Sequence, residues 1–188
     1  MLSALYETAG GTRLLDPEFI LAQLDVEVDQ HIGEFGCGGG GHFTFPLARR
    51  VGRGGMVYAV DVVPDVLESL RRRARVENLP QIQVIHSNLE VIGAAAIPEE
   101  SIDRVLCVNI LFQNIHHDHI FKEAQRLLKV SGKLLVVDWR QETGPVGPPL
   151  ARRVNLEQLK AVASTIGLHF ESEFSASVWH FGALFSRQ

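Results

Sequence analysis

A run of glycines between an apolar segment and an amphipathic one constrains this chain more than any other feature. The segment EFGCGGGGH occupies residues 34–42. It overlaps residues 31–35, which are typical of a short buried strand, and precedes residues 43–51, whose apolar spacing predicts a helix. Glycine permits tight turns and lets a ligand approach the backbone without obstruction by Cβ. A strand, a glycine turn and a helix in this order therefore predict a ligand-binding loop in an α/β fold.

Strands and helices alternate along most of the chain, as in a parallel sheet with helices on its faces. The predicted strands are 31–35, 56–61, 81–86, one within 102–112, and 134–139. The predicted helices are 17–24, 43–51, 65–77, 119–129 and 156–166. Two last strands, 168–174 and 178–185, are separated by a connection too short for a parallel crossover, so they must form an antiparallel hairpin. The predicted fold is a Rossmann-like, doubly wound, mostly parallel seven-stranded sheet with an antiparallel hairpin strand at the C-terminus.

Composition places the chain among folded proteins and limits its partners. We expect the 188 residues to form a single domain over 1–188, in which residues 1–30 are a helical segment that helps cover the ligand. Apolar residues make up 46% of the chain and the net charge is −4, which disfavours nucleic acid as a partner. No signal peptide or long apolar run is recognisable, so we expect a cytoplasmic protein with no membrane span.

Two acidic residues narrow the choice of ligand. Asp61 ends the second predicted strand, where a carboxylate can accept hydrogen bonds from both hydroxyls of a ribose. Glu34 lies close to the glycine turn, where it would repel a pyrophosphate and attract an ammonium group. Gly36, Gly38 and Gly41 also satisfy the dinucleotide pattern, so an NAD-dependent oxidoreductase is an alternative. The two acids favour a ligand that combines a ribose with a cationic tail.

The glycine segment also fits a more specific pattern. Residues 34–40 read acidic-x-G-x-G-x-G, and residues 123–139 read EAQRLLKVSGKLLVVDW. Together with the terminal hairpin, these segments resemble class I S-adenosylmethionine-dependent methyltransferases, specifically the small-molecule type related to ubiquinone and menaquinone biosynthesis enzymes. The resemblance covers residues 16–185 and departs from the family at Val130 and Ser131, where proline and glycine are commoner. It implies the fold given above and S-adenosyl-L-methionine as the cofactor.

The resemblance also assigns residues to that cofactor. They follow the ends of the first four strands and are Glu34, Gly36, Cys37, Gly38, Gly40, Asp61, Val62, Asn88, Leu89 and Asn109. Asn88 stands where the family usually has an aspartate beside the adenine, and its side-chain carbonyl can still accept a hydrogen bond from the adenine amino group. An alternative is that Asn88 is only a turn residue.

The implied reaction is in-line transfer of a methyl group to a small-molecule acceptor, in which the protein aligns the reactants and excludes water. No dedicated catalytic residue is required, and His116 and His117 are the candidates for a general base because they follow the fourth strand. No metal site is predicted. A homodimer remains open, as does a module that binds the cofactor or a partner without turnover.

Arginines in two further segments have alternative interpretations. The loop at 140–153 is expected either to cover the acceptor, with Arg152 or Arg153 meeting an anionic group, or to be an ordinary surface connection. The run RRRAR at 71–75 is interpreted as the solvated face of a helix in preference to an RNA-binding patch.

Overall fold

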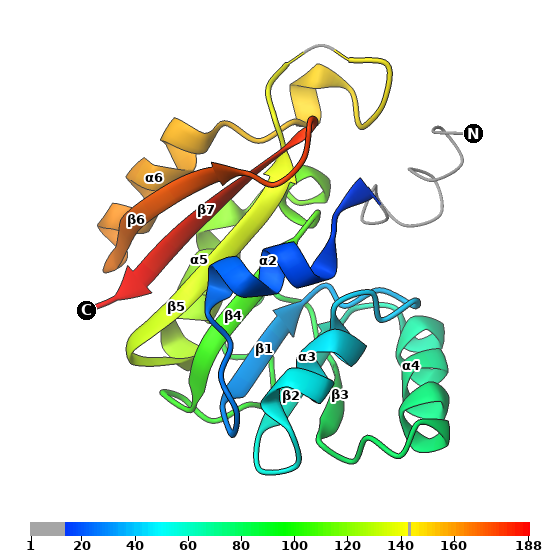
Figure 1. Cartoon of the computed structure of the whole chain (residues 1–188). Coiled ribbons are helices and arrows are strands. Elements are labelled where there is room, and N and C mark those ends of the chain that lie inside the picture. The colour runs from blue at the N-terminus through cyan, green and yellow to red at the C-terminus, as the bar shows by residue number, and fades with distance from the viewer. Residues whose placement is uncertain (1–13, 143) are drawn as a thin grey trace.

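A computed structural model of the chain describes residues 14–142 and 144–188, and Figure 1 shows a single sheet flanked by helices. The seven strands lie in the order β3-β2-β1-β4-β5-β7-β6. They are β1 (His31–Phe35), β2 (Met56–Asp61), β3 (Ile82–His86), β4 (Ile102–Val108), β5 (Leu128–Trp139), β6 (Leu168–Ser175) and β7 (His180–Arg187). Strands β1 to β5 pair in parallel, and β7 is antiparallel to both β5 and β6. The predicted fold class is confirmed.

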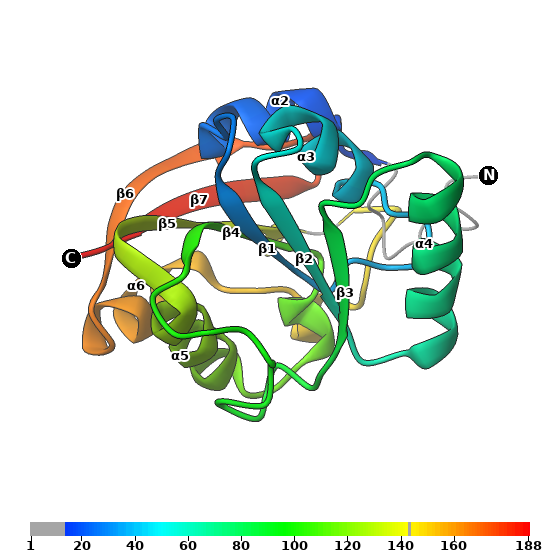
Figure 2. The same ribbon diagram turned by 90° about the horizontal axis from the view of Figure 1, so that it is seen from below.

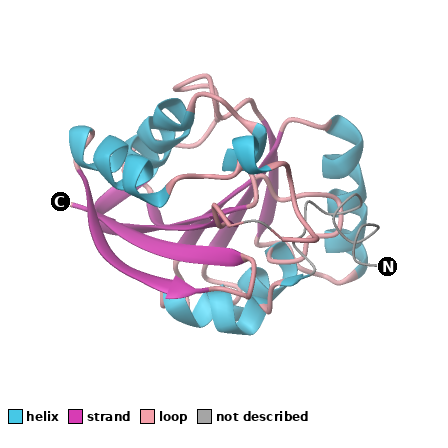
Figure 3. Cartoon of the chain, turned by 90° about the horizontal axis from the view of Figure 1, so that it is seen from above, coloured by secondary structure: helices cyan, strands magenta, loops and turns pink. Residues whose placement is uncertain are grey.

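Helices cover both faces of the sheet, as Figures 2 and 3 show. One face carries α2 (Pro17–Leu24), α3 (Thr44–Val51) and α4 (Pro64–Val76), and the other carries α5 (His117–Leu127) and α6 (Leu156–Thr165). Two single-turn 3-10 helices are η2 (Leu111–Gln113) and η3 (Leu150–Arg152). Successive side chains of β2 point to opposite faces of the sheet, so the core has two parts. Val57 and Ala59 pack on the face that carries α2, α3 and α4, and Val60 packs on the face that carries α5. This layering leaves the loops at the carboxyl ends of the strands free to form a site.

Most predicted boundaries are confirmed to within one residue, and those of three elements are wrong: α5, β5 and β7, which runs two residues later than the predicted 178–185. The helix at 17–24 begins after Asp16, whose carboxylate accepts a hydrogen bond from the Glu18 N–H at 3.0 Å. The helix predicted at 119–129 is α5, which starts two residues earlier. The strand predicted at 134–139 is β5, which starts at Leu128 because that residue already pairs with Ile102 of β4, before a register shift that brings Lys133 beside Arg104. Ser131, within that irregular stretch, has a φ of 64°.

The expected amino-terminal cover is only partly described. Residues 1–13 lie outside the described residues, so the expectation that they help cover the ligand stays a prediction. Helix α2 packs through Ile20, Leu21 and Leu24 onto the sheet. Among the helices of residues 14–142 and 144–188, none is long and apolar enough to cross a membrane.

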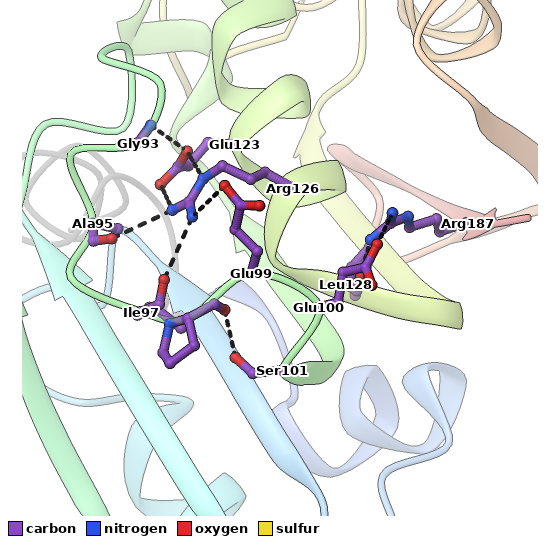
Figure 4. Close-up of polar contacts among 11 residues, drawn as sticks. Gly93, Ala95, Ile97, Glu99, Glu100, Ser101, Glu123, Arg126, Leu128 and Arg187 are labelled. Carbon is purple, nitrogen blue, oxygen red and sulfur yellow. Dashed lines mark hydrogen bonds and ion pairs between the residues drawn. The ribbon is translucent and has the colours of Figure 1, made fainter.

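The connection from β3 to β4 contains no helix and is held instead by a buried ion pair on α5 (Figure 4). The Arg126 guanidinium lies 2.7 Å from the carboxylate of Glu123, which is fully buried. Arg126 also donates to the carbonyl oxygens of Ala95 at 3.3 Å and Ile97 at 3.5 Å. The carboxylate of Glu123 accepts a hydrogen bond from the Gly93 N–H at 2.7 Å. Both ends of the pair therefore fix the backbone of this connection.

We predict that Arg126→Ala lowers the free energy of unfolding by about 3–5 kcal/mol, because it leaves the buried Glu123 carboxylate without its partner. The matched control on the same helix is Lys122→Ala, which removes an exposed ion pair with Asp118 and should cost about 1 kcal/mol or less. Urea denaturation of both variants measures the difference. Equal losses would show that the Glu123–Arg126 pair does not hold the fold.

Candidate functional site

A cavity of about 620 Å³ lies where the carboxyl ends of β1, β2, β3 and β4 meet. All ten residues that the sequence assigned to the cofactor line it: Glu34, Gly36, Cys37, Gly38, Gly40, Asp61, Val62, Asn88, Leu89 and Asn109. Four separate loops contribute these residues, as expected for an open parallel sheet in which such loops meet at one edge. The described structure thus brings the whole predicted set together around one space.

The glycine loop, residues 36–41, forms one wall of the cavity and leads from β1 into α3 (Figure 1). Gly36 has a φ of 74°, and a Cβ at that position would overlap the side chain of Ile110, so no larger residue fits there. Gly38 has a φ of 63°, and a Cβ at Gly38 or Gly40 would meet no described atom within 4 Å. The loop therefore turns toward the cavity and presents bare backbone to it.

Asp61 connects the end of β2 to the glycine loop. One carboxylate oxygen accepts a hydrogen bond from the Gly38 N–H at 3.0 Å, and the other accepts one from the Val63 N–H at 3.0 Å. A carboxylate has about four acceptor positions, so two remain for a ligand. Asp61 can thus hold the loop and receive a pair of hydroxyl groups at the same time.

Glu34 is a buried acid at the end of β1, with 4% of its surface exposed. Burial raises the pKa of Glu34 to about 8, an increase limited by a hydrogen bond from the Thr44 hydroxyl and enlarged by the charge of Asp61. The Thr44 hydroxyl lies 2.5 Å from the Glu34 carboxylate. An ammonium group entering the cavity would favour the ionised carboxylate, because it supplies the positive charge that the protein does not place there.

The loop after β3 forms the opposite wall. The side-chain carbonyl of Asn88 accepts a hydrogen bond from the Glu90 N–H at 2.9 Å, so Asn88 does act as a turn residue. That oxygen retains a second lone pair, and Asn88 lines the cavity beside Leu89. Ser87 also lines it, and its buried hydroxyl has no partner within the described part of the chain. The two interpretations of Asn88 are therefore compatible in this geometry.

The segment after β4 contributes an amide with unmet hydrogen bonds. Asn109 is 2% exposed and has a φ of 54°, and neither its amide nitrogen nor its amide oxygen has a partner in the described residues. Buried polar groups are normally paired, so an unpaired amide facing a cavity points to a ligand. The buried carboxyl group of Asp138 accepts hydrogen bonds from the N–H groups of Leu111 at 3.0 Å and Phe112 at 3.4 Å. These bonds fix the segment that follows Asn109.

His116 and His117 do not line the cavity in the described structure. The Nε2 atom of His117 lies 2.8 Å from the carbonyl oxygen of Leu111 and 3.0 Å from that of Asn114, so this nitrogen donates and cannot serve as a base without breaking these bonds. The ring of His116 stacks on that of His119 at 5.1 Å. The catalytic role considered for His116 and His117 stays a prediction that this geometry does not favour.

Ligand atoms of His116, Asp118 and His119 lie within 4.8 Å of one another at the start of α5. Two features oppose a cation at this place. The Asp118 carboxylate is already 2.8 Å from the Lys122 ammonium, and the N-terminus of a helix carries partial positive charge. We therefore assign no metal to this cluster.

Arg153 supports the loop at 140–153 from within. Its guanidinium is buried and donates to the carbonyl oxygens of Val146 at 2.7 Å, Pro148 at 3.0 Å and Arg140 at 3.4 Å, and to that of Glu142. These bonds occupy the donors that an anionic acceptor would need, so the expectation for Arg153 is wrong. Arg152 is exposed and is not among the residues that line the cavity.

Several cavity residues were missed by sequence reasoning. They are mainly apolar or local neighbours of the predicted set: Phe35, Gly39, His42, Phe43, Val63, Val66, Ser87, Val108, Ile110 and Ile120. His42 also lies 3.0 Å from the carbonyl oxygen of Leu15, through its Nε2 atom, and so joins the glycine loop to the segment before α2. Position beside the glycines was the available signal for His42 and Phe43.

The cavity has the chemistry that S-adenosylmethionine requires. Glu34 suits an ammonium group, Asp61 suits a ribose, and the bare backbone at Gly38 and Gly40 leaves room for close approach. The described lining contains neither lysine nor arginine, so a pyrophosphate would meet two acidic residues and no fixed positive side chain. Burial raises the pKa of the Cys37 thiol, which keeps this lining residue protonated and neutral.

Comparison with known proteins leads to the same assignment. The profile of a methyltransferase domain family matches residues 33–136, more than half of the chain. The ubiquinone/menaquinone biosynthesis C-methyltransferase UbiE of Hahella chejuensis is 31% identical over 114 residues, which cover 58% of this chain and 43% of that protein. A 23S rRNA (uracil-C(5))-methyltransferase, RlmD, of Edwardsiella ictaluri is 34% identical over 87 residues, 46% of this chain and 19% of that protein. Each match thus spans less than half the length of the curated relative.

Solved structures show the same fold. A SAM-dependent methyltransferase from Aquifex aeolicus superposes with a TM-score of 0.84 at 20% identity, covering 94% of this chain and 92% of that one. Geranyl diphosphate C-methyltransferase from Streptomyces coelicolor, solved with Mg²⁺, geranyl diphosphate and S-adenosyl-L-homocysteine, superposes with a TM-score of 0.74 at 13% identity, covering 92% and 79%. The family match, the sheet order and the cavity agree, and the chain belongs to the class I S-adenosylmethionine-dependent methyltransferases, with S-adenosylmethionine as its cofactor.

Proposed function

We propose that this chain is a single-domain enzyme that transfers the methyl group of S-adenosylmethionine to a small-molecule acceptor. The observation that carries the proposal is the cavity itself, which combines two carboxylates, a bare glycine backbone and an unpaired buried amide at the carboxyl edge of the sheet. The bound cofactor supplies an activated methyl group on a positively charged sulfur. The protein then has to hold, orient and desolvate the two reactants.

Each wall of the cavity has a separate task in this proposal. Glu34 holds the ammonium group of the cofactor and Asp61 holds its ribose, both through charge-assisted hydrogen bonds. Val62 and Leu89 form an apolar surface for the adenine, and the free lone pair of Asn88 accepts from the adenine amino group. The three positions fix the cofactor along its length, which leaves its reactive end near the segment after β4.

Residues beyond the cofactor walls would meet the acceptor. Phe43 and Ile110 line the cavity from the start of α3 and from the segment after β4, and the amide of Asn109, which the sequence assigns to the cofactor, lies between these apolar surfaces and the cofactor walls. Because the described lining has no cationic side chain to bind an anion, a neutral acceptor fits better than a phosphorylated one. In-line transfer to such an acceptor depends on alignment and exclusion of water more than on a base.

Two observations favour a small acceptor over RNA, the substrate named for the RlmD relative. The chain has a net charge of −4, whereas RNA binding relies on a positive surface. In the run at 71–75, Arg73 contacts Glu77 and the glycine loop, so it is not a free phosphate-binding group. The proposal therefore keeps the small-molecule acceptor suggested by the ubiquinone and menaquinone type.

We predict that the chain binds S-adenosylmethionine and S-adenosylhomocysteine with micromolar dissociation constants, equivalent to about −8 kcal/mol. NAD should bind at least tenfold more weakly, because its pyrophosphate would approach Glu34 and Asp61. Isothermal titration calorimetry with the three ligands decides the matter. Equal or tighter binding of NAD would contradict the proposal, and binding of the cofactor without turnover of a broad acceptor panel would favour a non-catalytic module.

Asp61→Ala should weaken S-adenosylhomocysteine binding by at least about tenfold, since it removes charge-assisted hydrogen bonds to the ribose and releases the Gly38 N–H. The control is Asp65→Ala, which removes an acid in the first turn of α4 that does not line the cavity. Affinity and melting temperature are measured on both variants. If the two variants bind alike, the ribose does not lie at Asp61.

Glu34 predicts a pH dependence of cofactor affinity. Its pKa of about 8 means that the ligand-free site is mostly protonated at pH 7, and the cofactor ammonium favours the ionised form. Binding must then release a proton, so affinity should rise from pH 6 to pH 7.5 by up to about tenfold per pH unit. Calorimetry in buffers of different ionisation enthalpy detects the released proton. Glu34→Gln should bind more weakly at pH 7.5 and lose this slope.

The same shift has the opposite sign for stability. The folded ligand-free protein keeps a proton on Glu34 between pH 4.5 and about 8 that the unfolded chain has lost, so this residue destabilises the fold as pH rises through that window. Glu34→Gln should therefore be at least as stable as the wild type at pH 8. A variant that loses both stability and affinity at pH 8 would assign Glu34 a structural role.

A further inference from the structure

One arginine of α4 reaches out of its helix and contacts the glycine loop. The Nη1 atom of Arg73 donates to the carbonyl oxygen of Gly40 at 2.8 Å. Its guanidinium carbon lies 3.8 Å from the centre of the Phe45 ring, and Nε lies 2.7 Å from the Glu77 carboxylate. Three separate partners thus fix the direction of this side chain, although about half of its surface is exposed.

The contact falls at the place where the loop needs support. A run of glycines gains much freedom when it is not held, because each glycine can occupy more backbone conformations than other residues. Asp61 holds the loop at the Gly38 N–H. The guanidinium of Arg73 packs on the face of the Phe45 ring, which is fully buried. This cation–π contact fixes the position of the guanidinium. The N–H groups of Gly36 and Cys37 bond to the carbonyl oxygen of Val60 at the start of the loop, and Arg73 adds an attachment at Gly40, two residues beyond the Asp61 contact.

We propose that Arg73 is a positioning residue for the cofactor, acting by holding the carbonyl group of Gly40 so that the glycine loop is ordered before the ligand binds. A loop that is already ordered loses less conformational freedom on binding, and affinity is higher for that reason. Arg73 does not line the cavity and acts through the loop alone. The inference rests on the proposal that S-adenosylmethionine binds along this loop, and it gives one arginine of the RRRAR run a task unrelated to RNA.

A matched control exists because Glu77 binds two arginines. Arg49 of α3 lies 2.6 Å from the second oxygen of the Glu77 carboxylate, and Arg73 lies 2.7 Å from the first. Arg49→Ala and Arg73→Ala each remove one exposed ion pair with Glu77. Of the two side chains, Arg73 is the one that donates a hydrogen bond to the glycine loop. A third variant, Arg72→Ala, lowers the charge of the RRRAR run without removing Arg73.

The measurement is the affinity for S-adenosylhomocysteine by calorimetry, with the melting temperature of each ligand-free variant. Arg73→Ala should bind about five- to tenfold more weakly than wild type, the range expected for one hydrogen bond and its ordering effect. Arg49→Ala and Arg72→Ala should bind as wild type does, and Arg73→Ala should melt at a lower temperature than Arg49→Ala because it also removes the Gly40 and Phe45 contacts. Equal affinity of Arg73→Ala and Arg49→Ala would overturn the inference. A wild type that does not bind at all would overturn the proposed function instead.

A second measurement separates loop ordering from a merely structural role. A Cβ at Gly39 would lie 3.7 Å from Val66, an ordinary contact, so Gly39→Ala is tolerated and restricts the loop. The effect of Gly39→Ala on affinity is measured in the wild type and in Arg73→Ala. We expect it to be more favourable in Arg73→Ala by at least about twofold, because the loop has more freedom to lose there. The same effect of Gly39→Ala in both backgrounds would show that Arg73 does not act through loop freedom.

Discussion

The close approach of two loops determines what this fold can bind. Gly36, after β1, faces Ile110, after β4, with no room for a side chain between them. This contact joins the wall assigned to the cofactor to the wall assigned to the acceptor, so that both surround one cavity. Because Asp138 fixes Leu111 and Phe112 from the end of β5, the position of Ile110 follows from the central strands of the sheet. The shape of the cavity therefore depends on this contact between the two loops.

Charge is divided between the cavity and its surroundings. The acids Glu34 and Asp61 line the cavity. Arg153 and Arg73 do not line it: Arg153 donates hydrogen bonds to four backbone carbonyl groups, and Arg73 donates one to the glycine loop. Such an arrangement favours a positively charged ligand, because the buried carboxyl group of Glu34 is ionised at little cost only when a cation enters. The pKa of Glu34 is thus raised in the ligand-free protein, and the ammonium group of the cofactor would lower it.

Local sequence signals predicted the fold and ten of the residues that line the cavity. Alternation and turn residues located β1, β2 and the terminal hairpin, and glycines with a neighbouring acid located the cavity, because these features depend on the backbone and on adjacent residues. Contacts of long side chains were not predictable in the same way. Arg73 finds its partner Gly40 far along the chain, and Arg153 and His117 are bound to carbonyl groups of nearby turns whose shape is not encoded by spacing alone. The early start of β5 likewise depends on its pairing with β4, where Leu128 lies beside Ile102.

The outer strand of the hairpin has a further consequence. Strand β6 lies at the edge of the sheet, its pairing with β7 is interrupted between Phe170 and Ser172, and the residue skipped there is Glu171. Glu171 and Glu173 form ion pairs with Lys133 and Lys160. A bulged edge that carries charged side chains offers a poor template for a strand from another molecule. Joining two sheets through β6 is therefore disfavoured, and the bulge protects this edge against growth into extended β-aggregates.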